Sequence, residues 1–306
     1  MHIPLPLKLT GSICALATPF RASDDALDLD AFRRLVGFQI RSGTRGLVVA
    51  GSTGEGAALD ATEFTTLVEV ARREITDRVP LLAGSGMQST RKTIEQTRLA
   101  AAAGADMALV VTPAYVRPTQ EGLYRHFSEV ADKGGLPIML YNVPSRTACD
   151  LLPETVARLC AHPAIIGIKE AGADEARMRD LLAFASATFA VFSGDDPTCA
   201  RAILAGAAGV ISVAANIAPA AMQDLCARAA EGDAEGARRL DLHLHELFAL
   251  LALEPNPIPV KWCLQRLGFG ADHLRLPLLP LSAGYHAQAE RVLGESGLIE
   301  PALQAI

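Results

Sequence analysis

The stretch AIIGIKE at residues 164–170 decides how this sequence is expected to fold. Its isoleucine-rich run has the composition of a strand that is buried on both faces, as the strands of parallel sheets are. The run ends in Lys169, and a buried ammonium group is costly unless it is paired or loses its proton. A deprotonated lysine is a nucleophile toward carbonyl carbons, although a lysine at the tip of a strand more often simply reaches water.

Further strand-like runs alternate with helical patterns on both sides of this stretch. The eight expected strands are 12–17, 46–50, 80–84, 107–112, 137–141, 165–169, 189–193 and 209–213. Apolar residues recur at helical spacing between them, most clearly over 29–40, 61–75 and 90–103. Eight strands separated by helices predict a closed α/β fold, a (β/α)8 TIM barrel with parallel strands. A doubly wound open sheet is the alternative, but no GxGxxG motif follows the first strand.

The strand pattern stops after about residue 215, and the remaining chain shows only helical patterns. These helices are expected over 220–230, 234–253 and 259–267. We therefore expect a barrel over residues 1–215 and a C-terminal helical region over residues 216–306 that packs on the barrel rather than forming an independent domain.

Composition argues against several classes of partner. The chain has 306 residues, a net charge of −6 and no basic run, which makes nucleic acid an unsuitable partner. Its apolar stretches are short or interrupted by charges, so no membrane span is expected, and residues 1–8 lack the pattern of a signal peptide. The six cysteines show neither CxxC nor Cys/His spacing, which argues against a zinc site and favours reduced cytoplasmic thiols.

Chemistry in a (β/α)8 barrel lies where the strands end. Five segments follow strand ends here, namely GSTGEG at 51–56, TPAY at 112–115, YNVPSR at 141–146, KE at 169–170 and SGDD at 193–196. They supply an amine, two phenols, two adjacent hydroxyls and a guanidinium, which is a set suited to carbonyl chemistry. The amine can form a Schiff base with a ketone, and phenols or hydroxyls can relay protons. Backbone amides of a glycine-rich turn and a guanidinium can each hold a carboxylate.

These residues also have purely structural interpretations. The turn at residues 51–54 can be only a tight connection, Tyr141 a core aromatic, Tyr115 a loop residue and Arg146 a partner in a surface ion pair. Helix capping is expected of three residues, Asp60, Ser89 and Asp196. Positions on helix surfaces are expected of three histidines that lack partners at ligand spacing, His126, His243 and His245.

The chain resembles the dihydrodipicolinate synthase family, within the N-acetylneuraminate lyase group of Schiff-base aldolases, from residue 11 to about residue 279. The motifs that carry this resemblance are GSTGE at 51–55, YNVPSRT at 141–147, GIKE at 167–170, SGDD at 193–196 and EPNPIPVK at 254–261. The first and third motifs are shared across the group. Arg146 after Asn-Val-Pro-Ser, together with the Glu-Pro-Asn-Pro stretch, is specific to the synthases.

The resemblance implies four catalytic and four substrate-binding residues. The catalytic set comprises Lys169, which condenses with pyruvate, and a proton relay of Tyr141, Ser52 and Tyr115, the last donated by a neighbouring subunit. The binding set comprises Thr53 for the pyruvate carboxylate, Arg146 for the carboxylate of the second substrate, and Gly194 and the carbonyl of Ile211, which shape the pocket.

The reaction that the resemblance implies is the condensation of pyruvate with L-aspartate 4-semialdehyde to give 4-hydroxy-tetrahydrodipicolinate, on the route to lysine and diaminopimelate. It implies a cytoplasmic lyase that uses no metal or organic cofactor and forms a homotetramer from two tight dimers. The chain departs from the family pattern with Ser52 for Thr, Ala114 for Tyr, Val116 for Asn and Ala214 for Thr.

Two other functions remain open at this point. One is a related pyruvate-dependent aldolase or dehydratase acting on a sugar acid or hydroxy-oxo acid, and Arg146 argues against it. The other is an inactive paralogue with a binding role, against which the intact Lys169, Tyr141 and Tyr115 argue.

Overall fold

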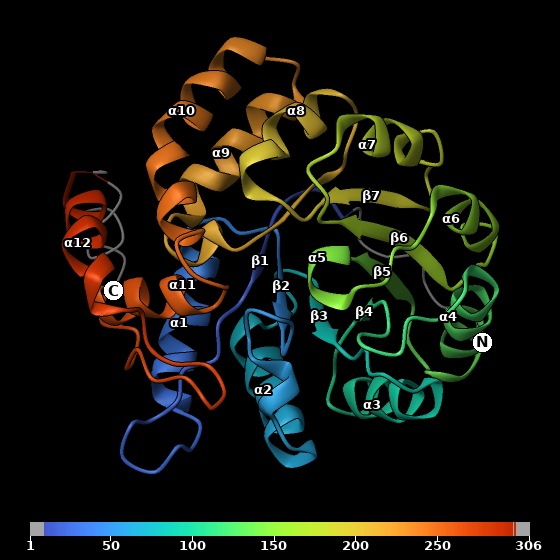
Figure 1. Cartoon of the computed structure of the whole chain (residues 1–306), viewed down its shortest axis with the longest axis horizontal. Coiled ribbons are helices and arrows are strands. Elements are labelled where there is room, and N and C mark those ends of the chain that lie inside the picture. Colours follow the sequence, from blue (N-terminus) through green and yellow to red (C-terminus); the bar gives the residue numbers. More distant parts are fainter. Residues whose placement is uncertain (1–8, 296, 298–306) are drawn as a thin grey trace.

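The computed structural model describes residues 9–295 and 297, which form a closed barrel of parallel strands inside a ring of helices (Figure 1). The strands are β1 (Gly11–Ala15), β2 (Gly46–Val49), β3 (Leu81–Gly84), β4 (Met107–Val111), β5 (Ile138–Asn142), β6 (Ile165–Glu170), β7 (Ala190–Ser193) and β8 (Gly209–Ser212). Each strand pairs with the next, and β8 closes the barrel on β1. The predicted (β/α)8 barrel is confirmed, and the open sheet is wrong. The expectation about a signal peptide concerns residues 1–8, which lie outside the described residues.

The helices of the described chain cover the outside of the barrel and its C-terminal flank. They are α1 (Leu29–Arg41), α2 (Ala61–Ile75), α3 (Thr90–Ala102), α4 (Gln120–Lys133), α5 (Pro144–Thr147), α6 (Pro153–Leu159), α7 (Glu175–Leu182), α8 (Cys199–Leu204), α9 (Pro219–Ala230), α10 (Ala234–Leu251), α11 (Ile258–Arg266) and α12 (His286–Glu295), with short 3₁₀ turns η1 (Gly56–Ala58), η2 (Asp196–Thr198), η3 (Ala214–Asn216) and η4 (Ala283–Tyr285). Every strand and helix named from the sequence is found, with ends that agree to about two residues, as expected for boundaries.

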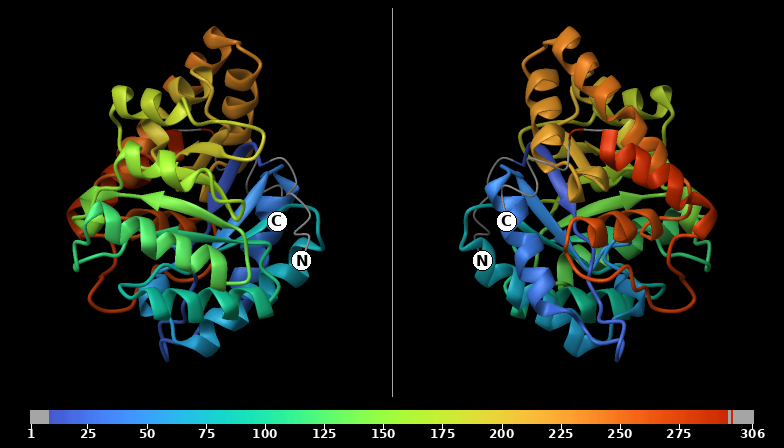
Figure 2. Two further views of the ribbon diagram at one scale, coloured as in Figure 1. Left: turned by 90° about the vertical axis from the view of Figure 1, so that its right-hand side faces the viewer. Right: turned by 90° about the vertical axis from the view of Figure 1, so that its left-hand side faces the viewer.

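The C-terminal helices lie against the barrel and not apart from it. Helix α9 packs on β1 and α8, α10 packs on α9 and α8, and α12 packs on α10. Figures 1 and 2 show these helices gathered on one flank of the barrel. A division of the chain at residue 215 stays a prediction, and the packing of α9 on β1 favours counting that helix with the barrel. Within the described residues, no helix is both long and apolar enough to cross a membrane.

The core has two layers, which explains why the strands are apolar on both faces. Side chains that fill the barrel interior include Val48, Leu82, Met139, Phe192 and Ile211, all with at most a trace of exposure. A larger layer lies between the strands and the surrounding helices. Full burial of one such side chain stabilises the fold by about 1.5–3 kcal/mol.

Two of the three predicted N-caps are confirmed, because the side chains of Asp60 and Ser89 accept hydrogen bonds from the first turns of α2 and α3. The prediction for Asp196 is wrong. Its Oδ2 accepts hydrogen bonds from the backbone N–H groups of Val213 and Ala214, at 3.0 and 2.8 Å. Because β7 and β8 are neighbours in the barrel, this carboxylate reaches the start of η3 and not the start of its own helix.

No group of three or more His, Cys, Asp or Glu side chains in residues 9–295 and 297 is placed to hold a metal ion.

The prediction of a surface position is wrong for His126, whereas His243 and His245 are exposed as expected. His126 follows Leu123 on the apolar face of α4, and only 5% of it is exposed. Its Nδ1 lies 2.9 Å from the hydroxyl of Thr90, and its other ring nitrogen is buried without a partner. Burial disfavours the charged imidazolium and lowers the pKa of His126 to about 4.

Acid should therefore destabilise this protein through His126. The histidine of the unfolded chain binds a proton near pH 6.5, whereas the folded one does so only near pH 4. Above pH 6.5 the imidazole is neutral in the folded and the unfolded chain, so its ionisation has no effect on stability. As the pH falls from 6.5 to 4, the free energy of unfolding drops by up to about 3 kcal/mol. In urea denaturation, His126→Gln should lose less stability than wild type across this range. His243→Gln is the control and should follow the wild type. Equal losses in wild type and His126→Gln would contradict the prediction.

Candidate active site

Lys169 and Tyr141 lie side by side at the carboxyl end of the barrel. Tyr141 on β5 is the register partner of Lys169 on β6, and Lys169 Nζ lies 4.5 Å from the centre of the Tyr141 ring. Only 5% of Lys169 and 8% of Tyr141 is exposed. Partner residues on paired parallel strands point to the same face, so the strand pairing itself brings the amine to the phenol.

A β-bulge sets this pairing. Ile138 pairs with Ile165, but the next residue, Met139, pairs with Gly167, so β6 contains one extra residue. Without the extra residue, Tyr141 would stand opposite Ile168, and Lys169 would point out toward the helices. Bulges that aim a side chain in this way are common beside active sites.

Gly194 confines the amine from the other side. A Cβ atom at Gly194 would lie 2.6 Å from Lys169 Cε and 2.9 Å from its Cγ, so any other residue would displace the lysine. The N–H of Gly194 donates to the carbonyl of Glu170 at 2.6 Å, which fixes the β7 loop against β6. Ile211 is fully buried in the barrel interior, on β8.

Glu170, next to Lys169, braces the ends of the strands from the opposite face. Its carboxylate accepts hydrogen bonds from Asn142 Nδ2 at 2.9 Å and the N–H of Gly172 at 2.7 Å, and it pairs with Arg177 at 3.3 Å. Burial raises the pKa of Glu170, and these three partners oppose that rise. The sequence gives no sign of this role, because the partners come from three separate segments.

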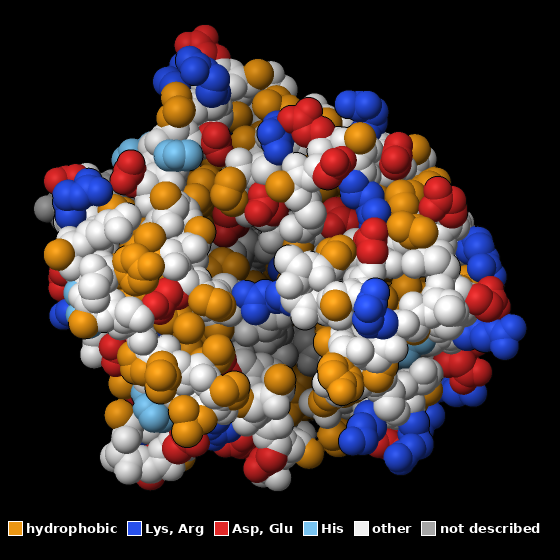
Figure 3. All heavy atoms as spheres, in the orientation of Figure 1, with side chains coloured by type: hydrophobic (Ala, Val, Ile, Leu, Met, Phe, Trp, Pro, Cys, Tyr) orange, Lys and Arg blue, Asp and Glu red, His pale blue; other side chains and the backbone are white. Residues whose placement is uncertain are grey.

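The loop between β2 and α2 carries two adjacent hydroxyl side chains, of which Ser52 is exposed and Thr53 is buried. Ser52 and Tyr141 both line a cavity of about 150 Å³ at the barrel mouth. Thr53 is buried, and its Oγ1 accepts a hydrogen bond from Asn256 Nδ2 at 3.0 Å. Figure 3 shows this face of the molecule hollowed at its centre.

Arg146 lies on the one-turn helix α5 that directly follows β5. Its side chain is exposed, and its Nη2 donates to the backbone carbonyl of Asn256 at 2.9 Å. Asn256 therefore contacts both Arg146 and Thr53. Asn256 lies inside the motif at 254–261, but no local pattern in the sequence indicates these two contacts.

Tyr115 is not brought to Lys169 within this single chain. It lies in the loop after β4 with 90% of its surface exposed, and its φ of +72° is unusual for any residue with a side chain. Val116, beside it, is 52% exposed. An exposed aromatic residue in a strained backbone conformation indicates a functional constraint on this loop.

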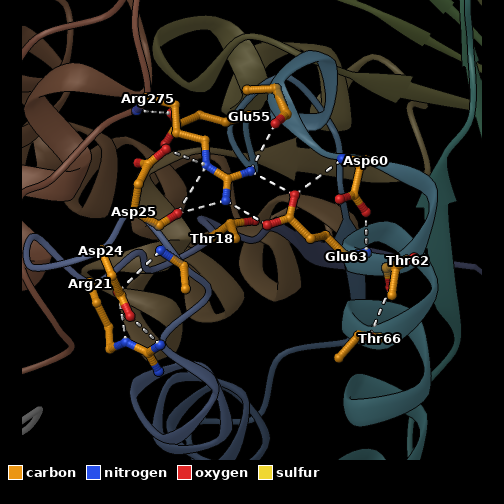
Figure 4. A network of polar contacts seen from close by, with 12 residues as sticks. Thr18, Arg21, Asp24, Asp25, Glu55, Asp60, Thr62, Glu63, Thr66 and Arg275 are labelled. Atoms are coloured by element: carbon orange, nitrogen blue, oxygen red, sulfur yellow. Dashed lines mark hydrogen bonds and ion pairs between the residues drawn. The ribbon is translucent and has the colours of Figure 1, made fainter.

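A buried ion pair also escaped the sequence analysis. Lys261 Nζ lies 2.5 Å from Glu55 Oε1, and each side chain is only 2% exposed. The other oxygen of Glu55 accepts from the N–H of Arg275 at 3.0 Å, and Arg275 in turn pairs with Glu63 and Asp25 (Figure 4). This network ties the glycine-rich loop to the C-terminal region.

Comparison with known proteins gives the same match from sequence and from structure. The model of the dihydrodipicolinate synthetase family matches residues 8–296. A 4-hydroxy-tetrahydrodipicolinate synthase from Xanthomonas axonopodis pv. citri is 55% identical over 294 residues, which cover 96% of this chain and 97% of the relative. One from Pseudomonas syringae pv. syringae is 48% identical over 95% of this chain and 99% of the relative.

Solved structures of similar proteins superpose on nearly the whole barrel. The chloride-inhibited dihydrodipicolinate synthase from Acinetobacter baumannii, complexed with pyruvate, has a TM-score of 0.93 and 43% identity, covering 95% of this chain and 100% of that one. The synthase from Thermotoga maritima has a TM-score of 0.92 and 39% identity, with 95% and 100% covered. Likeness of this extent, in both sequence and architecture, means that the chain belongs to the dihydrodipicolinate synthetase family.

Proposed function

We propose that this chain is a Schiff-base lyase that condenses pyruvate with L-aspartate 4-semialdehyde to 4-hydroxy-tetrahydrodipicolinate, in lysine and diaminopimelate biosynthesis. The observation that carries the proposal is the burial of Lys169 against Tyr141 at the carboxyl end of the barrel. The names of the relatives support the product, and the Acinetobacter baumannii structure, described as a complex with pyruvate, supports the first substrate.

The first half of the reaction uses Lys169 and the hydroxyls near it. Lys169 Nζ attacks the ketone carbon of pyruvate, and loss of one water molecule leaves an imine. Tyr141 supplies a proton to the departing hydroxyl and then accepts one from the methyl group, which gives an enamine. Ser52, which lines the same cavity as Tyr141, passes this proton on. The hydroxyl of Thr53 and nearby backbone amides hold the pyruvate carboxylate.

The second half joins the two substrates. The enamine carbon attacks the aldehyde carbon of L-aspartate 4-semialdehyde, which forms the carbon–carbon bond and leaves an alkoxide that takes up a proton. The amine of this substrate then attacks the imine carbon, closes the ring and frees Lys169. Arg146 at the mouth grips the carboxylate of this substrate in a charge-assisted contact. Gly194 leaves room for the lysine adduct. To the carbonyl of Ile211, on β8, we assign the role of shaping the pocket.

Self-association completes the proposal. The exposure of Tyr115 and Val116 is explained if a second copy of the chain covers this loop and receives Tyr115 in its own site. We propose a homotetramer made of two such dimers.

Free cysteines at all six positions support a reducing, cytoplasmic location. The machinery needs no metal or organic cofactor, because the imine supplies the electron sink.

A related aldolase or dehydratase acting on a sugar acid or hydroxy-oxo acid is the second candidate, favoured by Ser52 in the relay position. Coupled assays should separate the two. Turnover of pyruvate with L-aspartate 4-semialdehyde supports the proposal, whereas cleavage of sialic acid or turnover of 2-keto-3-deoxygluconate in its place supports the alternative. Absence of turnover with every substrate would favour the inactive paralogue.

Lys169 should carry the covalent adduct. Treatment with pyruvate and borohydride should fix a reduced three-carbon acid on Lys169, as located by peptide mass spectrometry. The matched control within the chain is Lys261, which is equally buried but paired with Glu55 and should stay unmodified. Lys169→Ala should lower turnover by about a thousandfold or more without loss of fold. An adduct on another lysine in active enzyme would refute the assignment.

Arg146 should select the second substrate. Because a charge-assisted contact contributes about 1.5–3 kcal/mol, Arg146→Ala should raise the KM for L-aspartate 4-semialdehyde by about 10- to 150-fold. Trapping of the pyruvate adduct should change little. Arg125→Ala, at an exposed arginine on α4, is the control. Equal damage to both steps would instead indicate a structural arginine.

Tyr115 should act in a neighbouring subunit. Mixed dimers of Tyr115→Phe and Lys169→Ala subunits contain one site with both groups intact, so a 1:1 random mixture should recover about a quarter of wild-type activity. The measurement is the initial rate after subunit exchange, with exchange confirmed by native mass spectrometry. No recovery after confirmed exchange would show that Tyr115 acts within its own chain, and full activity of Tyr115→Phe alone would show that Tyr115 has no role.

A further inference from the structure

Asn256 joins two parts of the site that are far apart in sequence. Its side-chain Nδ2 donates to Thr53 Oγ1 at 3.0 Å, and its backbone carbonyl accepts from Arg146 Nη2 at 2.9 Å. Under the proposed function, Thr53 holds the carboxylate of one substrate and Arg146 that of the other. A single residue of the C-terminal region thus contacts both groups.

The hydrogen bond to Thr53 determines where the threonine hydroxyl can donate. A hydroxyl has one hydrogen and two lone pairs, and Asn256 Nδ2 occupies a lone pair of Thr53 Oγ1. No protein acceptor takes the Thr53 hydrogen within the described residues. This hydrogen is therefore left for an anion in the site. An acceptor in the place of Nδ2 would capture the hydrogen instead and turn the hydroxyl away from the substrate.

Asn256 is also retained at a cost to stability. Its Oδ1 is buried, and no partner for it exists in the part of the chain that the structure describes. A buried acceptor without a partner destabilises the fold, because it gives up its bonds to water. Such unfavourable features persist mainly where function requires them.

The backbone that carries Asn256 is anchored to the same loop as Thr53. Lys261, on α11, forms the buried ion pair with Glu55, two residues beyond Thr53. Lys261 Nζ also lies 4.3 Å from the centre of the Phe20 ring. The ion pair thus holds the segment that follows Asn256 against the glycine-rich loop, and the contact with Phe20 holds the same segment against the chain that follows β1. Breaking a buried ion pair leaves an uncompensated charge, so this anchor is rigid.

We infer that Asn256 is a positioning residue of the active site, which orients the Thr53 hydroxyl toward the pyruvate carboxylate and fixes the backbone to which Arg146 is bound. The inference rests on the proposed function. It predicts that Asn256 acts on pyruvate through Thr53, so its contribution disappears when Thr53 has no hydroxyl. The effect must lie in the KM for pyruvate and not in turnover at saturation.

The experiment measures half-saturation of the borohydride-trapped adduct with pyruvate in wild type, Asn256→Ala, Thr53→Val and the double variant. Asn256→Ala should raise the half-saturating pyruvate concentration about tenfold, with the adduct yield at saturation within about twofold of wild type. The double variant should be no worse than Thr53→Val alone, since the two residues act as one unit. Gln265→Ala, at an exposed position on α11, is the matched control and should not differ from wild type.

Asn256→Asp tests the direction of the hydrogen bond without changing the size of the side chain. Its carboxylate accepts from Thr53 and repels the pyruvate carboxylate, so half-saturation should rise further than in Asn256→Ala. Thermal unfolding of both variants separates positioning from structure, because loss of a buried acceptor without a partner should leave the Tm of Asn256→Ala at or above that of wild type.

Two outcomes would overturn the inference. One is unchanged half-saturation in Asn256→Ala, and the other is a double variant whose defect equals the product of the two single defects. A wild-type protein that forms no pyruvate adduct would instead overturn the proposed function. If Asn256→Ala does not fold, Asn256→Leu, which has a similar shape and neither donor nor acceptor, replaces it in the same cycle with Thr53→Val and decides between these outcomes.

Discussion

The extra residue in β6 is the constraint on which the rest of the site depends. Ile166 points into the barrel, and strict alternation would then place Ile168 inside and Lys169 outside. In the structure Ile168 packs in the outer layer, and Lys169 lies inside beside Tyr141. The change of phase occurs at Gly167, where a Cβ atom would lie 2.3 Å from the carbonyl oxygen of Ala190. The glycine therefore permits both the bulge and the close approach of β7.

The two buried lysines of the described chain, Lys169 and Lys261, differ in their surroundings. Lys261 is neutralised by Glu55 at 2.5 Å, and burial and this pairing act on its pKa in opposite directions, with burial prevailing. Lys169 forms no ion pair in the described chain, and its Nζ lies 4.5 Å from the centre of the Tyr141 ring. The amine of Lys169 therefore carries no ion-pair partner that a substrate would have to displace, whereas the amine of Lys261 is held by Glu55.

Most of the fold could be predicted from the sequence because each strand and helix carries its own local pattern. Lys169 and Tyr141 were found because they end apolar runs, and the barrel rule places such residues at one rim. The two wrong predictions concern residues whose surroundings are set by tertiary packing and not by local sequence. Whether His126 is buried depends on what packs on α4, and what Asp196 caps depends on the neighbouring strand. The phase change at Gly167 leaves no periodic trace in a run of isoleucines.

Contacts between distant segments could not be predicted from the sequence either, because they depend on tertiary packing. Thr53 and Asn256 are 203 positions apart, and Glu55 and Lys261 are 206 positions apart. No local pattern indicates such partners, although all four residues lie in the motifs at 51–55 and 254–261. The only local indication of a buried ion pair was a charged residue among apolar ones, since a buried lysine or glutamate requires a partner.

These separations also order the assembly of the site. The pairing of β5 with β6 joins segments close in sequence, so Lys169 and Tyr141 can meet early in folding. The glycine-rich loop reaches its final geometry only when α11 docks, because Glu55 is otherwise a buried carboxylate without its cation. Thr53 and Arg146 acquire their shared partner in the same step. The position of Lys169 is thus set by the barrel, whereas the partner that Thr53 and Arg146 share comes from the C-terminal region packed against it.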